Sequence, residues 1–392
     1  MDLFDKCAQF TRAKEAIAAG YYPYFIPLSE TEGTQVTVNG HRLIMIGSNN
    51  YLGLTTHSKV RRAATDAIAR YGPSCTGSRF LNGNLSMHNE LERKLADFVG
   101  KEAGLVFSTG YQTNLGAISA IVGRGDVVIT DREDHASIVD GCRLSFGRMK
   151  RFRHNDMAHL ERVLKGCDDV GKLVVVDGVF SMGGDIAPLS DIVPLCKKYG
   201  ARLMVDDAHS VGVMGEGGRG TASHFGCTDD VDLIMYTFSK SFASLGGFIA
   251  GDENVIHYIQ HTARSLIFSA SMPPACAATV LAALEVMQEE PERIDRLLEI
   301  AAKMRKGFTD MGYNIGNSQT PIIPVFVGED IKTFQFWKIL FEEGVYVNPI
   351  VPPAVPPNQS LLRTSYMATH TDEQLNCVLE AFERIGKRLD LI

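Results

Sequence analysis

Short, continuously apolar runs alternate along this chain with segments of helical periodicity, and this alternation is the feature that most constrains its fold. The runs lack the polar and apolar alternation of a strand with one solvated face, so they predict strands that are buried on both faces. Such strands, separated by helices, are typical of an α/β domain with a mostly parallel sheet. The four runs are Asp126–Asp131, Lys172–Asp177, Arg202–Asp207 and Asp232–Phe238.

Helical patterns surround these runs. The segments Met157–Leu164 and Ile192–Tyr199 predict helices between the strands. A further helix is expected before the first run, with an apolar face made of Leu91, Leu95, Phe98 and Val99.

The last third of the chain predicts a smaller α+β domain. A helix that Pro291 opens would run to about Phe308, and a strand is expected at Pro321–Val327. A last helix would start at Thr371, with Gln374 completing a capping box. The first of these helices would carry Ile294, Leu297, Leu298 and Ala301 on one face, and the last would have an apolar stripe of Leu375, Val378, Leu379 and Phe382.

These patterns divide the chain into three parts. We expect an N-terminal arm at residues 1–45, a large α/β domain at 46–280 and a small C-terminal α+β domain at 281–392. Within the arm, Asn39–Gly40 predicts a two-residue hairpin turn, because both positions of such a turn need a positive φ.

Composition excludes several classes of protein. The chain has 392 residues, and its 45% hydrophobic and 22% charged residues are ordinary for a soluble globular protein. With 39 Lys and Arg against 46 Asp and Glu, the net charge is −7, so we expect no nucleic-acid partner. No apolar run approaches the roughly 18 residues of a membrane span, and the N-terminus lacks a signal-peptide core, so we expect a cytoplasmic location. No cysteine pair has the spacing of a zinc motif, and we expect no metal.

Polar side chains follow the apolar runs. In open parallel sheets, ligands bind beyond the carboxyl ends of the strands. We therefore expect the residues after the third and fourth runs to converge on one pocket, although Asp207 would only cap or pair. These residues are Asp206, Asp207, His209, Thr237, Ser239 and Lys240.

Lys240 has the most distinctive chemistry of this group. It lies in TFSKSFASLGG, beside small hydroxyl residues that suit a phosphate and ahead of Gly246 and Gly247, which would let the backbone approach a ligand closely. A lysine forms a Schiff base with a carbonyl cofactor, and a carboxylate such as Asp206 would keep a pyridine nitrogen protonated. An isolated lysine would be a surface residue, but these neighbours favour a cofactor site.

The segments VDDAHSVG (Val205–Gly212) and TFSK (Thr237–Lys240) resemble the α-oxoamine synthase family of pyridoxal-phosphate enzymes. This resemblance implies the fold type I architecture of aspartate aminotransferase, with a mostly parallel seven-stranded sheet in the large domain, a smaller C-terminal α+β domain, and pyridoxal 5′-phosphate (PLP) as cofactor. Other motifs agree in order along almost the whole chain: GSNNYLGL, GSRFLNG, FSTGYQTN, DHAS, VFSMGGDIAPL, FSASMPP and LRTSYMATHT.

The resemblance implies a role for each matching residue. Lys240 would hold the cofactor as a Schiff base, Asp206 would face the pyridine nitrogen and His135 would stack on the ring, and these three form the expected catalytic set. Arg363 would bind the carboxylate of the amino-acid substrate, a task that suits its planar fork. The other cofactor contacts would come from Gly110 and Tyr111 at a helix N-terminus, and from Ser181, His209, Thr237 and Ser239.

Members of this family build the active site at the interface of a homodimer. Either Ser269 or Ser271 is therefore expected to reach the partner's cofactor phosphate. Other histidines have no motif around them, and we expect them to be structural or surface residues. They are His57, His88, His154 and His159.

The implied reaction is the decarboxylative condensation of an amino acid with an acyl-CoA. TFSKSFASLGG, GSRFLNG and VNPIVPPAVPP most resemble the bacterial serine palmitoyltransferase branch, which condenses L-serine with palmitoyl-CoA to 3-oxosphinganine in sphingolipid synthesis. Gly20–Leu28 offers no cation for the distal carboxylate of a pimeloyl or succinyl chain and suits a lipid tail or a small acyl group, although packing against a partner subunit explains it equally well.

Several alternatives stay open. Within the family these are 8-amino-7-oxononanoate synthase and glycine C-acetyltransferase, and outside it an aminotransferase or a non-catalytic partner subunit. Because a long-chain thioester partitions into membranes, peripheral membrane association also stays open.

Overall fold

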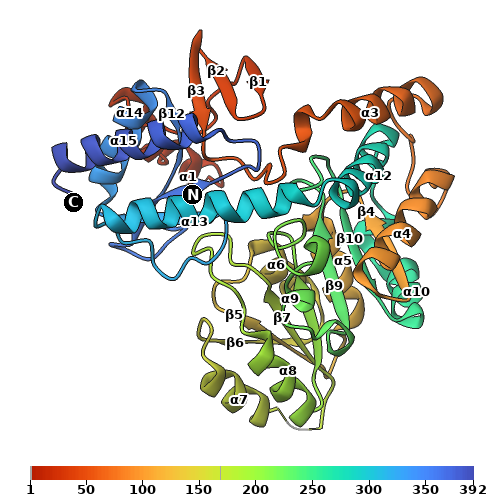
Figure 1. Cartoon of the computed structure of the whole chain (residues 1–392). Helices are drawn as coiled ribbons and strands as arrows, with labels where there is room; N and C mark the ends of the chain where they lie inside the picture. Colours follow the sequence, from red (N-terminus) through yellow and green to blue (C-terminus); the bar gives the residue numbers. More distant parts are fainter. Residues whose placement is uncertain (1, 168) are drawn as a thin grey trace.

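A seven-stranded sheet forms the centre of the larger part of the molecule (Figure 1). The computed structural model describes residues 2–167 and 169–392. The strand order is β4-β10-β9-β8-β7-β5-β6, with β10 antiparallel to both neighbours and the other pairs parallel. The predicted runs are confirmed as β5 (Val127–Asp131), β7 (Lys172–Asp177), β8 (Arg202–Asp206) and β9 (Leu233–Thr237).

Three strands of this sheet were not predicted. β6 (Arg148–Phe152) is an edge strand with the sequence RMKRF. Its three basic residues leave no continuous apolar run that would predict a strand. β10 (Gly247–Gly251) begins and ends in glycine, a residue that ordinarily weakens strands. β4 (Ala103–Phe107) is a short edge strand with only three fully apolar positions in sequence.

Helices cover both faces of the sheet. Successive residues of β7 point to opposite faces, since Val174 and Val176 belong to one hydrophobic core and Leu173 and Val175 to another. The first core receives side chains from α3 (Ser58–Tyr71), α4 (Ser86–Val99), α7 (Met157–Lys165), α8 (Leu189–Lys198), α9 (Thr221–His224) and α12 (Pro274–Glu289). The second receives them from α5 (Gly110–Ile121), α6 (Ala136–Leu144), α10 (Glu253–Thr262) and α11 (Arg264–Ile267).

The predicted helices of this region, together with the buried face of α4, are confirmed. Two-sided burial explains why the apolar runs were continuous rather than alternating. Within the described residues, no helix has both the length and the apolar character that crossing a membrane requires.

The smaller C-terminal part packs three helices around an antiparallel sheet of order β11-β14-β13. Its core contains Phe382 in ring contact with both Phe308 and Phe336. The capping box of the last helix is confirmed, since the Thr371 hydroxyl accepts from the Gln374 amide and Gln374 Oε1 accepts from the Thr371 amide. The elements are α13 (Glu292–Asp310), β11 (Ile322–Gly328), α14 (Asp330–Glu342), β13 (Asn348–Ile350), β14 (Ser360–Ser365) and α15 (Asp372–Arg388).

One detail of the predicted helix face is wrong. Ile294, Leu297 and Ala301 are buried, but Leu298 is 39% exposed. Position 298 lies at the edge of the apolar stripe of α13, where the helix turns away from the core.

The N-terminal segment joins the C-terminal part of the chain (Figure 1). The hairpin turn at Asn39–Gly40 is confirmed, with φ of 50° and 79°. Strand β3 after this turn pairs in parallel with β12, so the red and blue ends of the chain lie side by side in Figure 1. The elements are α1 (Asp5–Ala8), α2 (Arg12–Ala18), β1 (Glu30–Glu32), β2 (Gln35–Val38), β3 (His41–Met45) and β12 (Val345–Tyr346).

The boundaries 1–45, 46–280 and 281–392 stay a prediction. Helix α12 continues through residue 280 as one helix, and its buried residues belong to the core of the large sheet. Helix α13 follows after Pro291 and connects the two parts in Figure 1.

Phe382→Ala should lower the free energy of unfolding of the small domain by about 3–5 kcal/mol, because it removes a fully buried ring and leaves a cavity. Leu298→Ala is the control, and its effect should stay within about 0.5 kcal/mol because the side chain is partly solvated. Chemical denaturation followed by circular dichroism measures both. Equal losses would contradict the described core.

Candidate active site

A cavity of about 250 Å³ opens at the carboxyl ends of the central strands. The strand register places Asp177 beside Asp206, and Asp206 beside Met235, and all three residues line the cavity. The cavity therefore lies where parallel sheets ordinarily bind ligands. It brings together every residue expected to contact the cofactor: Gly110, Tyr111, His135, Ser181, Asp206, His209, Thr237, Ser239 and Lys240.

Asp207 points away from this cavity. It is fully buried, and its carboxylate accepts hydrogen bonds from the backbone amide of Thr221, at 3.0 Å, and from the Ser210 hydroxyl. Neighbouring residues at a strand end face opposite sides, so Asp206 serves the cavity while Asp207 holds the following loop. The expectation that Asp207 pairs without entering the chemistry agrees with this geometry.

Arg363 lies behind the wall of the cavity. This side chain is buried and comes from β14 of the C-terminal part. Its Nε donates to the carbonyl oxygen of Ser181 at 2.6 Å, and its Nη2 donates to Asn49 Oδ1 at 3.1 Å. Since Ser181 itself lines the cavity, the guanidinium brings positive charge from the small domain to the edge of the site.

Lys240 presents a half-buried amine to the cavity. Burial lowers the pKa of this amine to about 8, because lost hydration outweighs the attraction of Asp206 and Asp177. Within the described residues, no hydrogen bond or ion pair engages the amine. A sizeable neutral fraction near pH 8 makes Lys240 a nucleophile and a proton acceptor.

Asp206 is held at the base of the cavity by two donors. Asn114 Nδ2 donates to its Oδ2 at 2.7 Å, and the backbone amide of Ala208 donates to its Oδ1 at 3.0 Å. Such bonds fix the orientation of the carboxylate at the cavity. Sequence analysis quoted the motif that contains Asn114 but gave the residue no role, because its partner lies 92 positions away.

His135 is the N-cap of α6 and lines the cavity. Its backbone amide donates to Asp177 Oδ2 at 3.0 Å, and its Nδ1 lies 2.8 Å from the Ser137 hydroxyl. Burial lowers the pKa of His135, and the charge of Lys240 lowers it further. A neutral ring fixed at both backbone and side chain suits stacking on a flat ligand.

His209 follows β8 and is fixed by a residue that sequence analysis missed. The Tyr51 hydroxyl lies 2.7 Å from His209 Nδ1. Burial raises the pKa of Tyr51 to about 12, so the phenol stays protonated. Burial and the charges of Lys240 and Arg363 hold the pKa of His209 well below its usual range. The imidazole is therefore neutral, with one ring N–H and one acceptor nitrogen, and Tyr51 engages its Nδ1.

Groups that suit an anion also line the cavity. Helix α5 begins at Gly110, so its first backbone N–H groups have no partner within the helix. The Thr237 and Ser239 hydroxyls lie 3.1 Å apart beside it. A side chain at position 110 would approach Thr237 Oγ1 to 2.6 Å, so only glycine lets the helix end come this close. Helix dipole, amides and hydroxyls together suit a phosphate.

The prediction for Gly247 is wrong. Gly246 lines the cavity, but a Cβ at Gly247 would lie 2.6 Å from the Cα of Gly110. Gly247 therefore lets β10 approach the start of α5, rather than a ligand approach β10.

Ser269 and Ser271 both lie outside the cavity of their own chain. Ser269 accepts a hydrogen bond from Gln112 Nε2 at 2.9 Å, and the buried Ser271 hydroxyl has no hydrogen-bond partner within the described residues. Neither residue is therefore among those that would contact a cofactor in the cavity of its own chain.

Comparison with known proteins establishes the family. A family model for aminotransferases of class I and II matches residues 41–382. The chain belongs to that family. It is 49% identical to the serine palmitoyltransferase of Sphingobacterium spiritivorum, over 99% of this chain and 98% of that enzyme. It is 42% identical to the 8-amino-7-oxononanoate synthase of Thermoanaerobacter pseudethanolicus, over 97% of each chain.

Solved structures agree with this membership. The Sphingomonas wittichii serine palmitoyltransferase has a TM-score of 0.97 and 38% identity, covering all of both chains. A serine palmitoyltransferase solved with a PLP internal aldimine has a TM-score of 0.97 and 36% identity, also over both full chains. The resemblance to α-oxoamine synthases and the fold type I architecture are thus confirmed.

Lys240 should react with acetic anhydride at lower pH than an ordinary lysine. Its labelling should rise through about pH 8, because burial favours the neutral amine. Lys59, whose pKa is raised by its hydrogen bond to Glu289, is the internal control and should label only at more alkaline pH. Peptide mass spectrometry on the cofactor-free protein measures both. Coinciding midpoints would show that the amine of Lys240 is not buried.

Proposed function

We propose that this chain is a PLP-dependent serine palmitoyltransferase, which condenses L-serine with palmitoyl-CoA and releases CoA, carbon dioxide and 3-oxosphinganine. One observation carries the proposal. The amine of Lys240, the carboxylate of Asp206 and the N-terminus of α5 line a single cavity. These are the three groups that recognise an aldehyde, a pyridine nitrogen and a phosphate.

The residues present fit PLP. Lys240 would bind the aldehyde, Asp206 the ring nitrogen and His209 the 3′-oxygen. His135 would stack on the ring, and Ser181 would contact it from the side. The phosphate would be held by Gly110, Tyr111, Thr237 and Ser239. When bound, PLP withdraws electrons from the Cα of an attached amino acid.

The chain's own groups would supply binding and proton transfer. Arg363 would hold the substrate carboxylate through its planar fork. Lys240 would accept the proton from the substrate Cα, since burial lowers the pKa of its amine to about 8, close to neutral pH. Asp206 would keep its negative charge opposite the ring nitrogen, and His135 would fix the substrate face.

Sequence relationships support the choice of substrate. Four relatives named serine palmitoyltransferase are 49–52% identical to the chain. Relatives named 8-amino-7-oxononanoate synthase are 42–44% identical, and this activity is the second candidate. In the segment Gly20–Leu28, Phe25 is 93% exposed and available to an acyl chain or a partner subunit.

We propose a homodimer with the site at its interface. Tyr111 and Leu245 line the cavity yet are 41% and 47% exposed, so the cavity opens onto an apolar surface that a second subunit would cover. In that assembly Ser269 or Ser271 would reach the partner's phosphate. A cytoplasmic location and peripheral contact with membranes complete the proposal.

Purified protein should release CoA fastest from palmitoyl-CoA with L-serine. A thiol reagent measures this release for serine, alanine and glycine against palmitoyl-, pimeloyl- and acetyl-CoA. Alanine with pimeloyl-CoA as the best pair would establish the second candidate, and glycine with acetyl-CoA would overturn both. An aminotransferase would release no CoA at all.

Lys240→Ala is the control for this panel. It should keep the circular dichroism of the folded protein but lose CoA release and the yellow colour of lysine-bound cofactor. Turnover by this variant at the wild-type rate would exclude Lys240 from the chemistry.

A further inference from the structure

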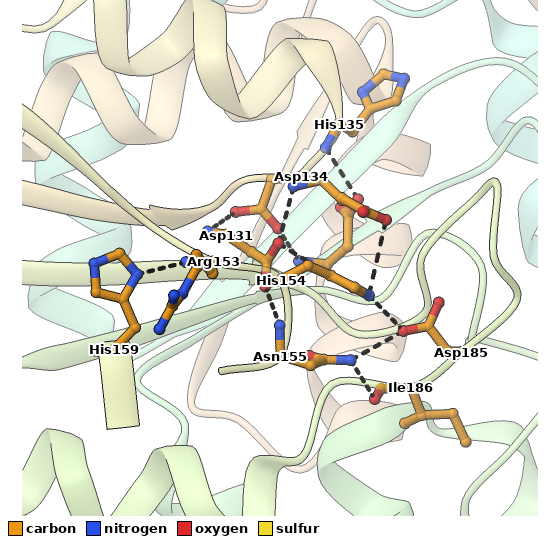
Figure 2. Close-up of polar contacts among 11 residues, drawn as sticks. Asp131, Asp134, His135, Arg153, His154, Asn155, His159, Asp185 and Ile186 are labelled. Atoms are coloured by element: carbon orange, nitrogen blue, oxygen red, sulfur yellow. Dashed lines mark hydrogen bonds and ion pairs between the residues drawn. The ribbon is translucent and has the colours of Figure 1, made fainter. Parts of the chain in front are cut away.

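His154 lies between acidic side chains, behind His135 (Figure 2). Its Nδ1 is 3.1 Å from Asp131 Oδ1, and its Nε2 is 2.8 Å from Asp185 Oδ2. Glu133 Oε2 is 3.8 Å from the same Nε2. Carboxylate oxygens only accept, so both ring nitrogens must carry a hydrogen to make both bonds. With both carboxylates ionised, this geometry requires an imidazolium, a charge that the expectation of a structural or surface histidine did not include.

The electrostatics agree with that geometry. Burial would lower the pKa of His154, but the hydrogen bonds and charges of Asp131 and Asp185 outweigh burial and raise it to about 10. Two further buried acids, Asp134 and Asp177, lie at the same edge of the sheet. The positive charge of His154 offsets part of the cost of placing Asp131, Glu133 and Asp185 close together.

Backbone bonds connect this cluster to His135. Asp134 spans the ends of β5 and β7, since its Oδ2 accepts from the Asp131 amide at 2.7 Å and its Oδ1 accepts from the Asp177 amide at 2.9 Å. Asp177 in turn accepts from the His135 amide at 3.0 Å. The position of His135 therefore depends on the strand end to which His154 is bound (Figure 2).

The other side of His154 holds the turn that carries Ser181. The ring packs edge-on against Phe180, with centroids 4.4 Å apart. Asp185 closes this turn, because its carbonyl accepts from the Phe180 amide at 3.0 Å. Between these two residues lies Ser181, whose carbonyl oxygen holds Arg363 Nε at 2.6 Å.

We propose that His154 is a positioning residue, whose imidazolium ties the turn bearing His135 to the turn bearing Ser181. It touches neither substrate nor cofactor. It fixes the wall against which Arg363 rests and the backbone that carries His135. The inference rests on the proposed function for the roles of His135 and Arg363.

Amino-acid binding tests the proposal in the PLP-loaded protein. His154→Gln removes the charge and leaves at most one carboxylate bonded. The dissociation constant for L-serine, from the change in cofactor absorbance, should rise about tenfold to a hundredfold, the range that one charge-assisted hydrogen bond is worth. His159→Gln is the matched control, because the His159 ring accepts a bond from the Arg153 amide (Figure 2) and, within the described residues, makes no side-chain hydrogen bond or ion pair with an acid. His154→Lys, which keeps a cation, should recover part of the affinity.

A second readout distinguishes a cation from a packing residue. A histidine whose folded pKa is raised stabilises fully below its unfolded pKa of about 6.5 and loses that effect as pH rises through about 10. The difference in melting temperature between wild type and His154→Gln should therefore be largest near pH 6.5 and shrink towards pH 10. The groups facing His154 in this range are Asp131, Glu133 and Asp185, with Phe180 as the apolar contact.

The outcomes are decisive. Equal serine affinity in His154→Gln and His159→Gln, or a melting difference that does not shrink at high pH, overturns the proposal. If His154→Gln does not fold, Asp185→Asn removes the charge at one end of the bridge and should weaken serine binding in the same direction; unchanged binding overturns the proposal. If alanine or glycine proves to be the substrate, the same titration with that amino acid still tests His154, while the substrate proposal alone fails.

Discussion

A half-buried amine and two buried carboxylates share one edge of the central sheet, and the rest of the site depends on this arrangement. The register of β7 and β8 sets Asp177 beside Asp206, and their charge partly restores the pKa of Lys240 that burial depresses. The pKa of the Lys240 amine is therefore about 8, so near that pH the amine is partly protonated and partly neutral. Moving a strand by one residue would turn these side chains into the core and leave Lys240 alone.

Two kinds of contact shape the cavity, namely side-chain hydrogen bonds and close backbone packing. At the deep end, Asn114 and Tyr51 fix the orientation of Asp206 and His209 through single hydrogen bonds. Near the start of α5, the shape of the site depends on close backbone packing. Gly110 and Gly247 let a helix end and a strand approach more closely than any side chain would allow.

Sequence patterns predicted most of this architecture, for identifiable reasons. Strands buried on both faces give continuous apolar runs, and Thr371 with Gln374 is a local signal that needs no tertiary contact. Strand β6 was not predicted because its sequence is mostly basic. Strand β10 was not predicted because it contains glycines, which allow close packing there. The acidic contacts of His154 could not be predicted, since its partners come 23 positions before it and 31 after it, and no local motif records such pairs.

We propose that Asp206 keeps the ring nitrogen of PLP protonated. Nitrogen NMR of the protein loaded with ring-labelled PLP measures this directly, in wild type, in Asp206→Asn and in Asp207→Asn, whose carboxylate faces the neighbouring loop. The account predicts a protonated ring nitrogen at neutral pH in wild type and in Asp207→Asn, and an unprotonated one in Asp206→Asn. A ring nitrogen that stays protonated in Asp206→Asn would contradict it.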